Sequence, residues 1–130
     1  MPQLNIAVAG AGVIGRAHID VIAQSSLCRL SAIADPSEAA QALAQAHGVP
    51  WFATLDELLA AVSPDGVILA TPNAMHVPQA LQCIAAGVPV LVEKPIAHTV
   101  ADAQKLVQAT QAYQAKVLIG HHRAHSPIMR

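Results

Sequence analysis

Three glycines and one carboxylate have residue types and a spacing that could bind a phosphate-containing ligand. Gly10, Gly12 and Gly15 form a Gly-x-Gly-x-x-Gly motif directly after the apolar run 4–9. Asp35 follows Gly15 by 20 residues and ends the next strand-like run, 28–34. A glycine turn that opens into a helix presents backbone N–H groups and the positive end of the helix dipole to a pyrophosphate. With an acid at the end of the second strand, the pattern predicts a dinucleotide-binding turn.

Each position in this motif has its own expected role. Gly10 allows a tight turn, Gly12 lets the backbone approach a pyrophosphate, and Gly15 lets the helix pack closely on the first strand. Val13 and Ile14 start the helix whose free N–H groups face the phosphates. The alternative is an ordinary strand–helix–strand unit with a solvated aspartate. The strand, the helix and the acid occur in the required order, which favours the binding function.

Asp35 also indicates which dinucleotide is bound. Its carboxylate can accept hydrogen bonds from both hydroxyls of the adenosine ribose. A 2′-phosphate would meet like charge there, and the neighbouring Pro36 and Ser37 offer no cation. The sequence therefore favours NAD over NADP.

Lys94 is the candidate for acid–base chemistry. It comes directly after the apolar run 88–92 and Glu93, where a strand should end beside the nicotinamide half of a bound dinucleotide. Hydride transfer from an alcohol needs a base for the hydroxyl proton, and a lysine at this position can shuttle that proton. The alternative is a solvated loop cation paired with Glu93, and spacing alone leaves both interpretations open.

The elements that must position these residues alternate along the chain. Strands are expected at 4–9, 28–34, 49–53, 67–70, 88–92 and 116–120, with helices beginning near Val13, Ser37, Thr54, Met75 and Thr99. This order is typical of an α/β fold with a doubly wound parallel sheet, here a six-stranded Rossmann sheet in the order 3-2-1-4-5-6. Apolar spacing predicts that Ile14, Ala17, His18, Val21 and Ile22 share one face of the first helix, and that Ala103, Leu106, Val107, Thr110 and Tyr113 share one face of the last.

Composition limits the classes of protein. The chain has 130 residues, enough for one domain with a core, and a formal net charge of -1, which gives no argument for binding nucleic acid or an anionic membrane. No apolar run approaches the length of a membrane span, and no targeting segment is visible. The two cysteines, Cys28 and Cys83, lack CxxC spacing and are expected as buried free thiols, which suits a cytoplasmic protein.

Four motifs together resemble the Gfo/Idh/MocA family of NAD(P)-dependent sugar and cyclitol oxidoreductases, and the likeness extends over essentially the whole chain. The motifs are the glycine turn, Ala70-Thr71-Pro72-Asn73 with His76, Glu93-Lys94-Pro95, and Gly120-His121-His122-Arg123. The resemblance implies that Lys94 is the active-site lysine and that Glu93 lies near the nicotinamide ribose. It implies that the cofactor's middle and nicotinamide end are lined by Thr71, Pro72, Asn73 and His76. Arg123 would form the floor of the substrate pocket, with His122 as further polar lining.

The same resemblance predicts an incomplete enzyme. Ala124 stands where the family often has a second arginine, and family members carry a second domain that binds substrate and supplies an Asp and a His for proton transfer. The chain reaches only Arg130. We therefore expect residues 1–120 to be the dinucleotide-binding domain and 121–130 to begin the connection to an absent substrate domain. The isolated chain should then be inactive on sugars and polyols, and should either self-associate or have a disordered tail from about His121. The alternative is a stand-alone NAD-binding sensor or partner-binding module.

His121, His122 and His125 could in principle hold a metal ion. No nearby cysteine or carboxylate supports a ligand spacing, so no metal site is expected. Lining of a sugar pocket and a solvated tail are the other interpretations.

Overall fold

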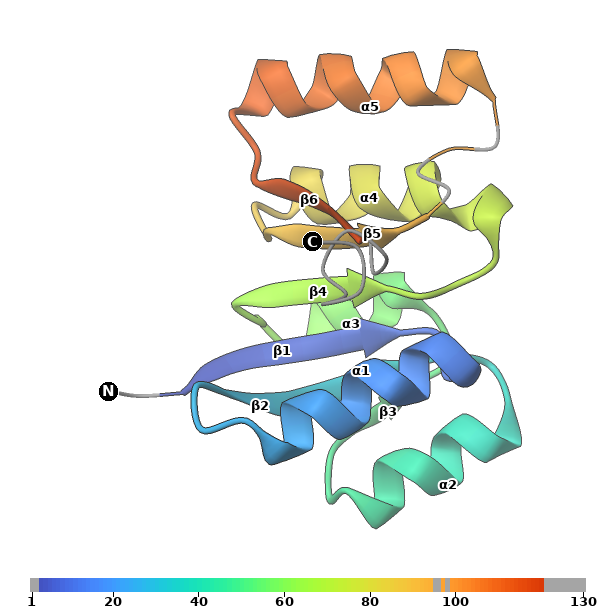
Figure 1. Cartoon of the computed structure of the whole chain (residues 1–130), viewed down its shortest axis with the longest axis vertical. Coiled ribbons are helices and arrows are strands. Elements are labelled where there is room, and N and C mark those ends of the chain that lie inside the picture. The colour runs from blue at the N-terminus through green and yellow to red at the C-terminus, as the bar shows by residue number, and fades with distance from the viewer. Residues whose placement is uncertain (1–2, 95–96, 98, 121–130) are drawn as a thin grey trace, which may run out of the picture.

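The computed structural model describes residues 3–94, 97 and 99–120. Six strands form one sheet in the order β3-β2-β1-β4-β5-β6, and every neighbouring pair is parallel (Figure 1). The strands are β1 Leu4–Ala9, β2 Cys28–Ala34, β3 Trp51–Phe52, β4 Gly66–Leu69, β5 Val90–Glu93 and β6 Val117–Gly120. The predicted fold and strand order are confirmed, although β3 is shorter than the run 49–53.

Helices connect successive strands, and three of them begin at a capping hydroxyl. They are α1 Val13–Gln24, α2 Glu38–Ala46, α3 Leu55–Ala61, α4 His76–Ala85 and α5 Val100–Tyr113, and a short 3-10 turn, η1 Asn73–Met75, precedes α4. The side chains of Ser37, Thr54 and Thr99 accept hydrogen bonds from backbone N–H groups three residues on, which satisfies donors that the helix leaves free. No helix within the described ranges is long and apolar enough to cross a membrane.

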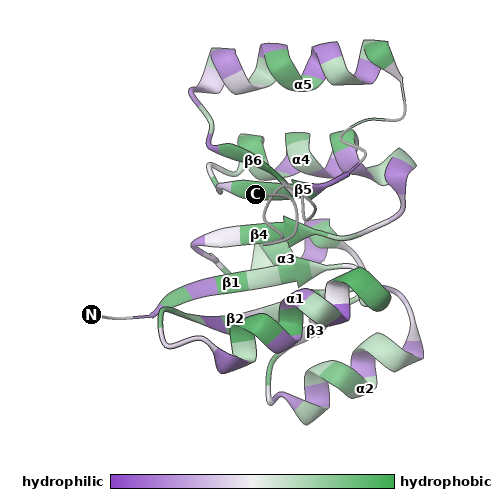
Figure 2. Cartoon of the chain, viewed as in Figure 1, coloured by the Kyte–Doolittle hydropathy of each residue, from purple (hydrophilic) through white to green (hydrophobic). Residues whose placement is uncertain are grey.

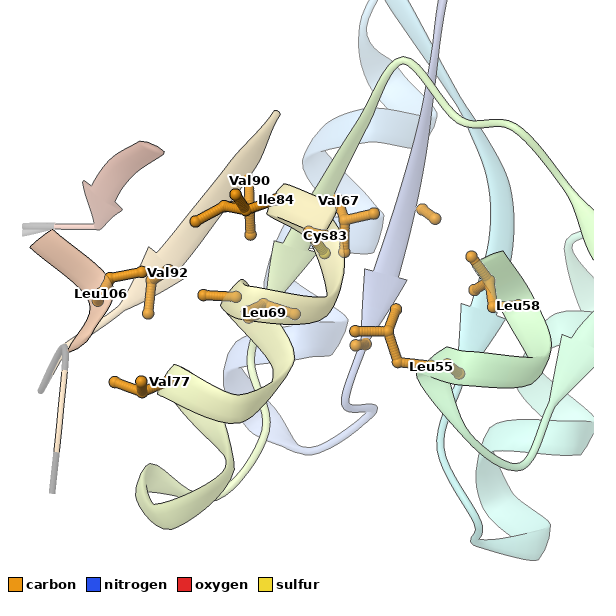
Figure 3. Packing of buried hydrophobic residues seen from close by; sticks show 14 of the residues in the cluster. Leu55, Leu58, Val67, Leu69, Val77, Cys83, Ile84, Val90, Val92 and Leu106 are labelled. Carbon is orange, nitrogen blue, oxygen red and sulfur yellow. The ribbon is translucent and has the colours of Figure 1, made fainter. Parts of the chain in front are cut away.

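Helices pack on both faces of the sheet. On one face α3, α4 and α5 pack on β1, β2, β4 and β5 through a cluster that includes Leu58, Leu69, Cys83, Val92 and Leu106 (Figure 3). On the other face α1 and α2 pack on β1 and β2, where Ile19, Ala40 and Ala44 contact Val8 and Ile33. In Figure 2 the helices alternate between hydrophobic and hydrophilic colour, as expected for helices that cover a sheet with one face and meet solvent with the other.

The helix faces differ from the sequence prediction. In α1 the buried residues are Gly15, Ile19 and Ile22, whereas Ile14 and Val21 are exposed. Because Gly15 has no side chain, the helix approaches the sheet closely on the side that carries Gly15. That side is buried, although the side with Ile14 and Val21 is more apolar. In α5 only Leu106 is buried, and the predicted partners Val107 and Tyr113 are exposed.

The described helices leave part of one face open. A groove of about 710 Å³ runs over β4, β5 and β6 on the side that carries α1, and apolar side chains such as Val21, Ile68, Leu91 and Leu118 line it. Val21 and Leu118 are 69% and 68% exposed. β6 is also the edge strand of the sheet. The described residues therefore present an apolar surface beside an edge strand.

Candidate functional site

The glycine turn connects β1 to α1 and packs against the backbone that follows β4. Gly10 has φ +98°, and a Cβ added there would lie 2.4 Å from the carbonyl oxygen of Ala70. A Cβ added at Gly15 would lie 1.9 Å from the carbonyl oxygen of Gly10. Both glycines are thus required by backbone contacts, at the positions where the motif predicts a tight turn and close helix packing.

Gly12 has a different environment. A Cβ added there would meet no atom within 4 Å, so the backbone faces open space. Gly12 is also the N-cap of α1, where no side chain caps the helix and no acidic residue occupies the first turn. The positive end of this 12-residue helix is therefore open to an anion.

Asp35 ties the end of β2 to the glycine turn. Its Oδ2 accepts a hydrogen bond of 2.8 Å from the backbone N–H of Ala11, and its Oδ1 accepts one of 2.8 Å from Ser37. Burial alone raises the pKa of Asp35, but the hydrogen bonds from Ser37 and Ala11 outweigh it and hold the pKa below its usual value. The Trp51 indole N–H donates to the carbonyl oxygen of Asp35 at 2.7 Å and fixes the backbone from β3. The carboxylate is thus ionised and held in place at the mouth of the turn.

A cavity of about 580 Å³ opens beside Asp35, at the carboxyl ends of β2, β3 and β4. One wall comes from Pro36 and the segment 53–56, and the other from Thr71, Pro72 and the start of α4. The lining is largely apolar, with Gln79 and Gln82 of α4 among the polar groups. A cavity with apolar walls and a carboxylate at its rim fits a nucleoside.

Two side chains of α4 hold the loop that follows β4. The His76 ring, only 1% exposed, donates from Nε2 to the carbonyl oxygen of Thr71 at 2.8 Å. The hydroxyl of Thr71 donates to Oε1 of Gln79, which is 7% exposed. Asn73 starts the turn η1. His76 therefore lies beneath the loop and shapes it, while Thr71 and Pro72 face the cavity.

Glu93 and Lys94 lie at the carboxyl end of β5. Oε1 of Glu93 contacts Nε2 of His18 on α1, a contact that links the glycine-turn helix to this strand. Lys94 follows directly and is exposed, and the ion pairs of the described residues do not include one between Lys94 and Glu93. The carboxylate is thus engaged by histidine, which leaves the lysine amine accessible.

This geometry agrees with the sequence relationship. Residues 4–121 match the sequence profile of the Gfo/Idh/MocA group, described as an oxidoreductase family with an NAD-binding Rossmann fold. The chain belongs to this family. Its six-stranded parallel sheet is accordingly the NAD-binding Rossmann fold of the Gfo/Idh/MocA family.

Relatives of this Gfo/Idh/MocA domain are much longer. The rhizopine catabolism protein MocA of Rhizobium meliloti is 32% identical over 130 residues, which is 100% of this chain and 41% of that protein. Inositol 2-dehydrogenase of Leifsonia xyli subsp. xyli is 38% identical over 112 residues, 85% of this chain and 33% of that enzyme. The crystal structure of WlbA dehydrogenase from Bordetella pertussis, in complex with NADH and UDP-GlcNAcA, superposes with a TM-score of 0.92 at 29% identity, over 98% of this chain and 40% of that one. The chain thus spans about two fifths or less of their length.

Some predicted positions lie outside the described residues. These are Pro95, His121, His122, Arg123 and His125. Within the described ranges, no group of three or more His, Cys, Asp or Glu side chains could hold a metal ion. Cys28 and Cys83 are both free, and burial raises the pKa of Cys83 to about 12, so this thiol stays protonated and unreactive at neutral pH.

Sequence reasoning overlooked several contacts in the Gfo/Idh/MocA domain. It treated His18 as a packing residue, although His18 is the partner of Glu93. It assigned nothing to Gln79, Gln82 or the indole of Trp51, which line or brace the nucleoside cavity. The available signal was the polarity of Gln79 and Gln82 on an otherwise apolar stretch of α4.

Proposed function

We propose that residues 1–120 form the NAD-binding domain of a two-domain oxidoreductase that transfers a hydride between NAD and a sugar, cyclitol or related polyol. Membership of the Gfo/Idh/MocA family supports the cofactor and the reaction class. An inositol 2-dehydrogenase and a dehydrogenase crystallised with a nucleotide sugar among the relatives support the substrate class. Because this chain spans 41% or less of those relatives, the substrate pocket would be shared with a second domain.

The observation that carries the proposal is the ionised Asp35 beside an open glycine turn. The backbone at Gly12 and the uncapped start of α1 would hold the pyrophosphate, since no described residue comes within 4 Å of a Cβ placed at Gly12 and no side chain caps the helix. The carboxylate of Asp35 keeps lone pairs free beyond its two backbone bonds and would accept the ribose hydroxyls. A 2′-phosphate at this place would face a fixed negative charge, so NAD should bind better than NADP.

NAD supplies the hydride acceptor when it is bound. The chain's own part in the reaction would be proton transfer, because the exposed amine of Lys94 lies at the carboxyl end of β5 and is not paired with Glu93. In the direction of oxidation, Lys94 would take the proton of the substrate hydroxyl as the carbon loses its hydride. The contact from His18 would keep the Glu93 carboxylate away from that amine and free its second oxygen for the nicotinamide ribose.

Calorimetric titration of the chain with NAD and NADP tests this proposal. We expect the chain to bind NAD more tightly than NADP. Asp35→Ala should weaken the binding of NAD and reduce the difference in affinity between the two cofactors. Asp20→Ala is the matched control, because it removes one negative charge from an exposed position of α1. Equal affinity of the unaltered chain for both cofactors, or a preference for NADP, would refute the assignment.

A second measurement concerns the missing half of the substrate pocket. The chain alone should produce no NADH from a panel of polyols, since the part of the substrate pocket that the second domain would supply is needed to hold a substrate beside Lys94. Steady turnover by the isolated chain would show that the proposed division between two domains is wrong.

A further inference from the structure

Arg16 is a basic side chain of α1 that is hydrogen-bonded to the glycine turn. Its Nε donates to the carbonyl oxygen of Ala11 at 3.0 Å. The backbone N–H of the same residue, Ala11, donates to the carboxylate of Asp35 at 2.8 Å. A guanidinium and a carboxylate are thus fixed to the two polar backbone groups of one turn residue. Arg16 is otherwise exposed, so the rest of its guanidinium is accessible to a ligand that binds at the turn.

The terminal nitrogens of this guanidinium are not used within the described structure. The ion pairs among the described residues do not include Arg16, although Asp20 lies one turn further along α1 and Asp35 lies across Ala11. Side chains of a helix lean toward its N-terminus, and the bond to Ala11 shows that Arg16 does so, away from Asp20. The N–H bonds of Nη1 and Nη2 are therefore left for an acceptor that arrives with a ligand.

A cation at this place would balance the negative charges expected around the turn. Asp35 is ionised, and a pyrophosphate held at Gly12 and at the start of α1 would bring further negative charge beside it. The helix dipole offers only a partial positive charge. No acidic residue occupies the first turn of α1, where it would compete for the guanidinium. A cation tied to the carbonyl oxygen of Ala11 would reduce the repulsion between the carboxylate and the phosphates.

We infer that Arg16 binds the pyrophosphate of the cofactor, as a side-chain contact in addition to the backbone of the glycine turn. The inference rests on the proposed binding of NAD. With Nε held by Ala11, the nitrogens Nη1 and Nη2 would donate to phosphate oxygens, and the planar guanidinium would need little further ordering. Arg16 would then serve the phosphates, whereas Asp35 serves the ribose.

The experiment measures the dissociation constant of NADH at a series of KCl concentrations. Arg16→Gln removes the charge and should weaken NADH binding about tenfold in dilute buffer. This is the low end of the range for a hydrogen bond to a charged group, because the side chain is exposed. Salt screens exposed charges, so the ratio between the dissociation constants of the variant and the unaltered chain should fall to about threefold at about 0.5 M KCl.

Arg29→Gln is the matched control. Arg29 is also exposed, and its Nε donates to Oδ1 of Asn5 at 2.6 Å. Asn5 and Arg29 pair near the amino ends of β1 and β2, at the edge of the sheet opposite the glycine turn. This variant makes the same change in net charge and should bind NADH like the unaltered chain at every salt concentration. An equal loss in both variants would show an effect of net charge alone and overturn the inference.

The other outcomes separate this inference from the proposed function. If Arg16→Gln binds NADH as tightly as the unaltered chain, the guanidinium does not contact the cofactor. If the loss is the same at every salt concentration, Arg16 only supports the turn through its bond to Ala11. If the loss is much larger for NADPH than for NADH, the guanidinium serves the 2′-phosphate instead. Each of these results overturns the role of Arg16 and leaves dinucleotide binding intact, whereas an unaltered chain that binds neither dinucleotide would refute the proposed function as well.

Discussion

Alanine substitutions at Gly15 and Gly12 should affect different properties of the chain. Gly15→Ala should lower the stability of the fold, and Gly12→Ala should weaken NADH binding. A Cβ at Gly15 would lie 1.9 Å from the carbonyl oxygen of Gly10, whereas real Cβ contacts are essentially never shorter than 3.0 Å. The atoms must therefore separate by more than 1 Å. Gly10 cannot yield, because it is itself held against the backbone of Ala70. At Gly12 the added Cβ would meet nothing within 4 Å, and φ is −77°, which alanine adopts freely.

The expected magnitudes follow from these contacts. Overpacking of a rigid core costs about 1–3 kcal/mol and sometimes more, so Gly15→Ala should lose about 3 kcal/mol of a total stability of about 5–15 kcal/mol. In a domain of this size that loss lowers the melting temperature by about 10 °C. Gly12→Ala should change stability by less than about 1 kcal/mol. It would, however, place a methyl group where the phosphates bind and cost one charge-assisted hydrogen bond, about 1.5–3 kcal/mol, which weakens NADH binding at least tenfold.

Thermal unfolding followed by circular dichroism measures the stabilities. Energy transfer from the single tryptophan, Trp51, to NADH measures binding, because its indole lies against the backbone of Asp35. If Gly12→Ala destabilises the chain as much as Gly15→Ala does, the space beside Gly12 is not open to a Cβ. If Gly12→Ala binds NADH as tightly as the unaltered chain, phosphate does not bind at this turn.

Two further predictions concern pH and association. Since the folded-state pKa of Asp35 lies below its usual value, the ionised carboxylate stabilises the fold above the usual pKa, and this contribution is lost as the pH falls through the folded-state pKa. The difference in unfolding free energy between the unaltered chain and Asp35→Asn should therefore shrink between about pH 6 and about pH 3 in urea titrations, and a constant difference would contradict it. The apolar groove and the edge strand β6 should make the isolated chain self-associate, and Leu118→Lys should reduce this in sedimentation experiments. A monomer at all concentrations would be the contrary result.

The order of the strands could be predicted from the sequence because it depends on local signals. Apolar runs separated by capping residues such as Ser37 and Thr54 mark the elements, and the rules for parallel connections then permit few arrangements. The buried faces of the helices could not be predicted in the same way. In α1 the apolar spacing predicts Ile14 and Val21 on the buried face, but the structure exposes both and buries Gly15 and Ile19. Small residues allow a helix to approach a sheet, and hydropathy alone gives them too little weight.

In the candidate site, too, some features could be predicted from the sequence and others could not. Gly10, Gly15 and Asp35 could be placed from their spacing because their geometry is determined within one strand–helix–strand unit. The contact between His18 and Glu93 joins residues 75 positions apart, and no periodicity along the chain marks such a pair. The roles of Thr71, His76 and Lys94 in binding or catalysis stay predictions, although the structure brings all three to the carboxyl edge of the sheet.

The double attachment of Asp35 has a consequence for redesign and for evolution. Exchanging an acid at the end of the second strand for a neutral or basic residue is the obvious route to a protein that uses NADP. Here the same carboxylate also accepts the N–H of Ala11 inside the glycine turn. A single exchange for a residue without an acceptor oxygen, such as Arg or Lys, would therefore alter cofactor preference and loosen the turn at once. A lineage that changes cofactor at this position needs a second substitution that restores an acceptor for Ala11, so the two changes should be found together.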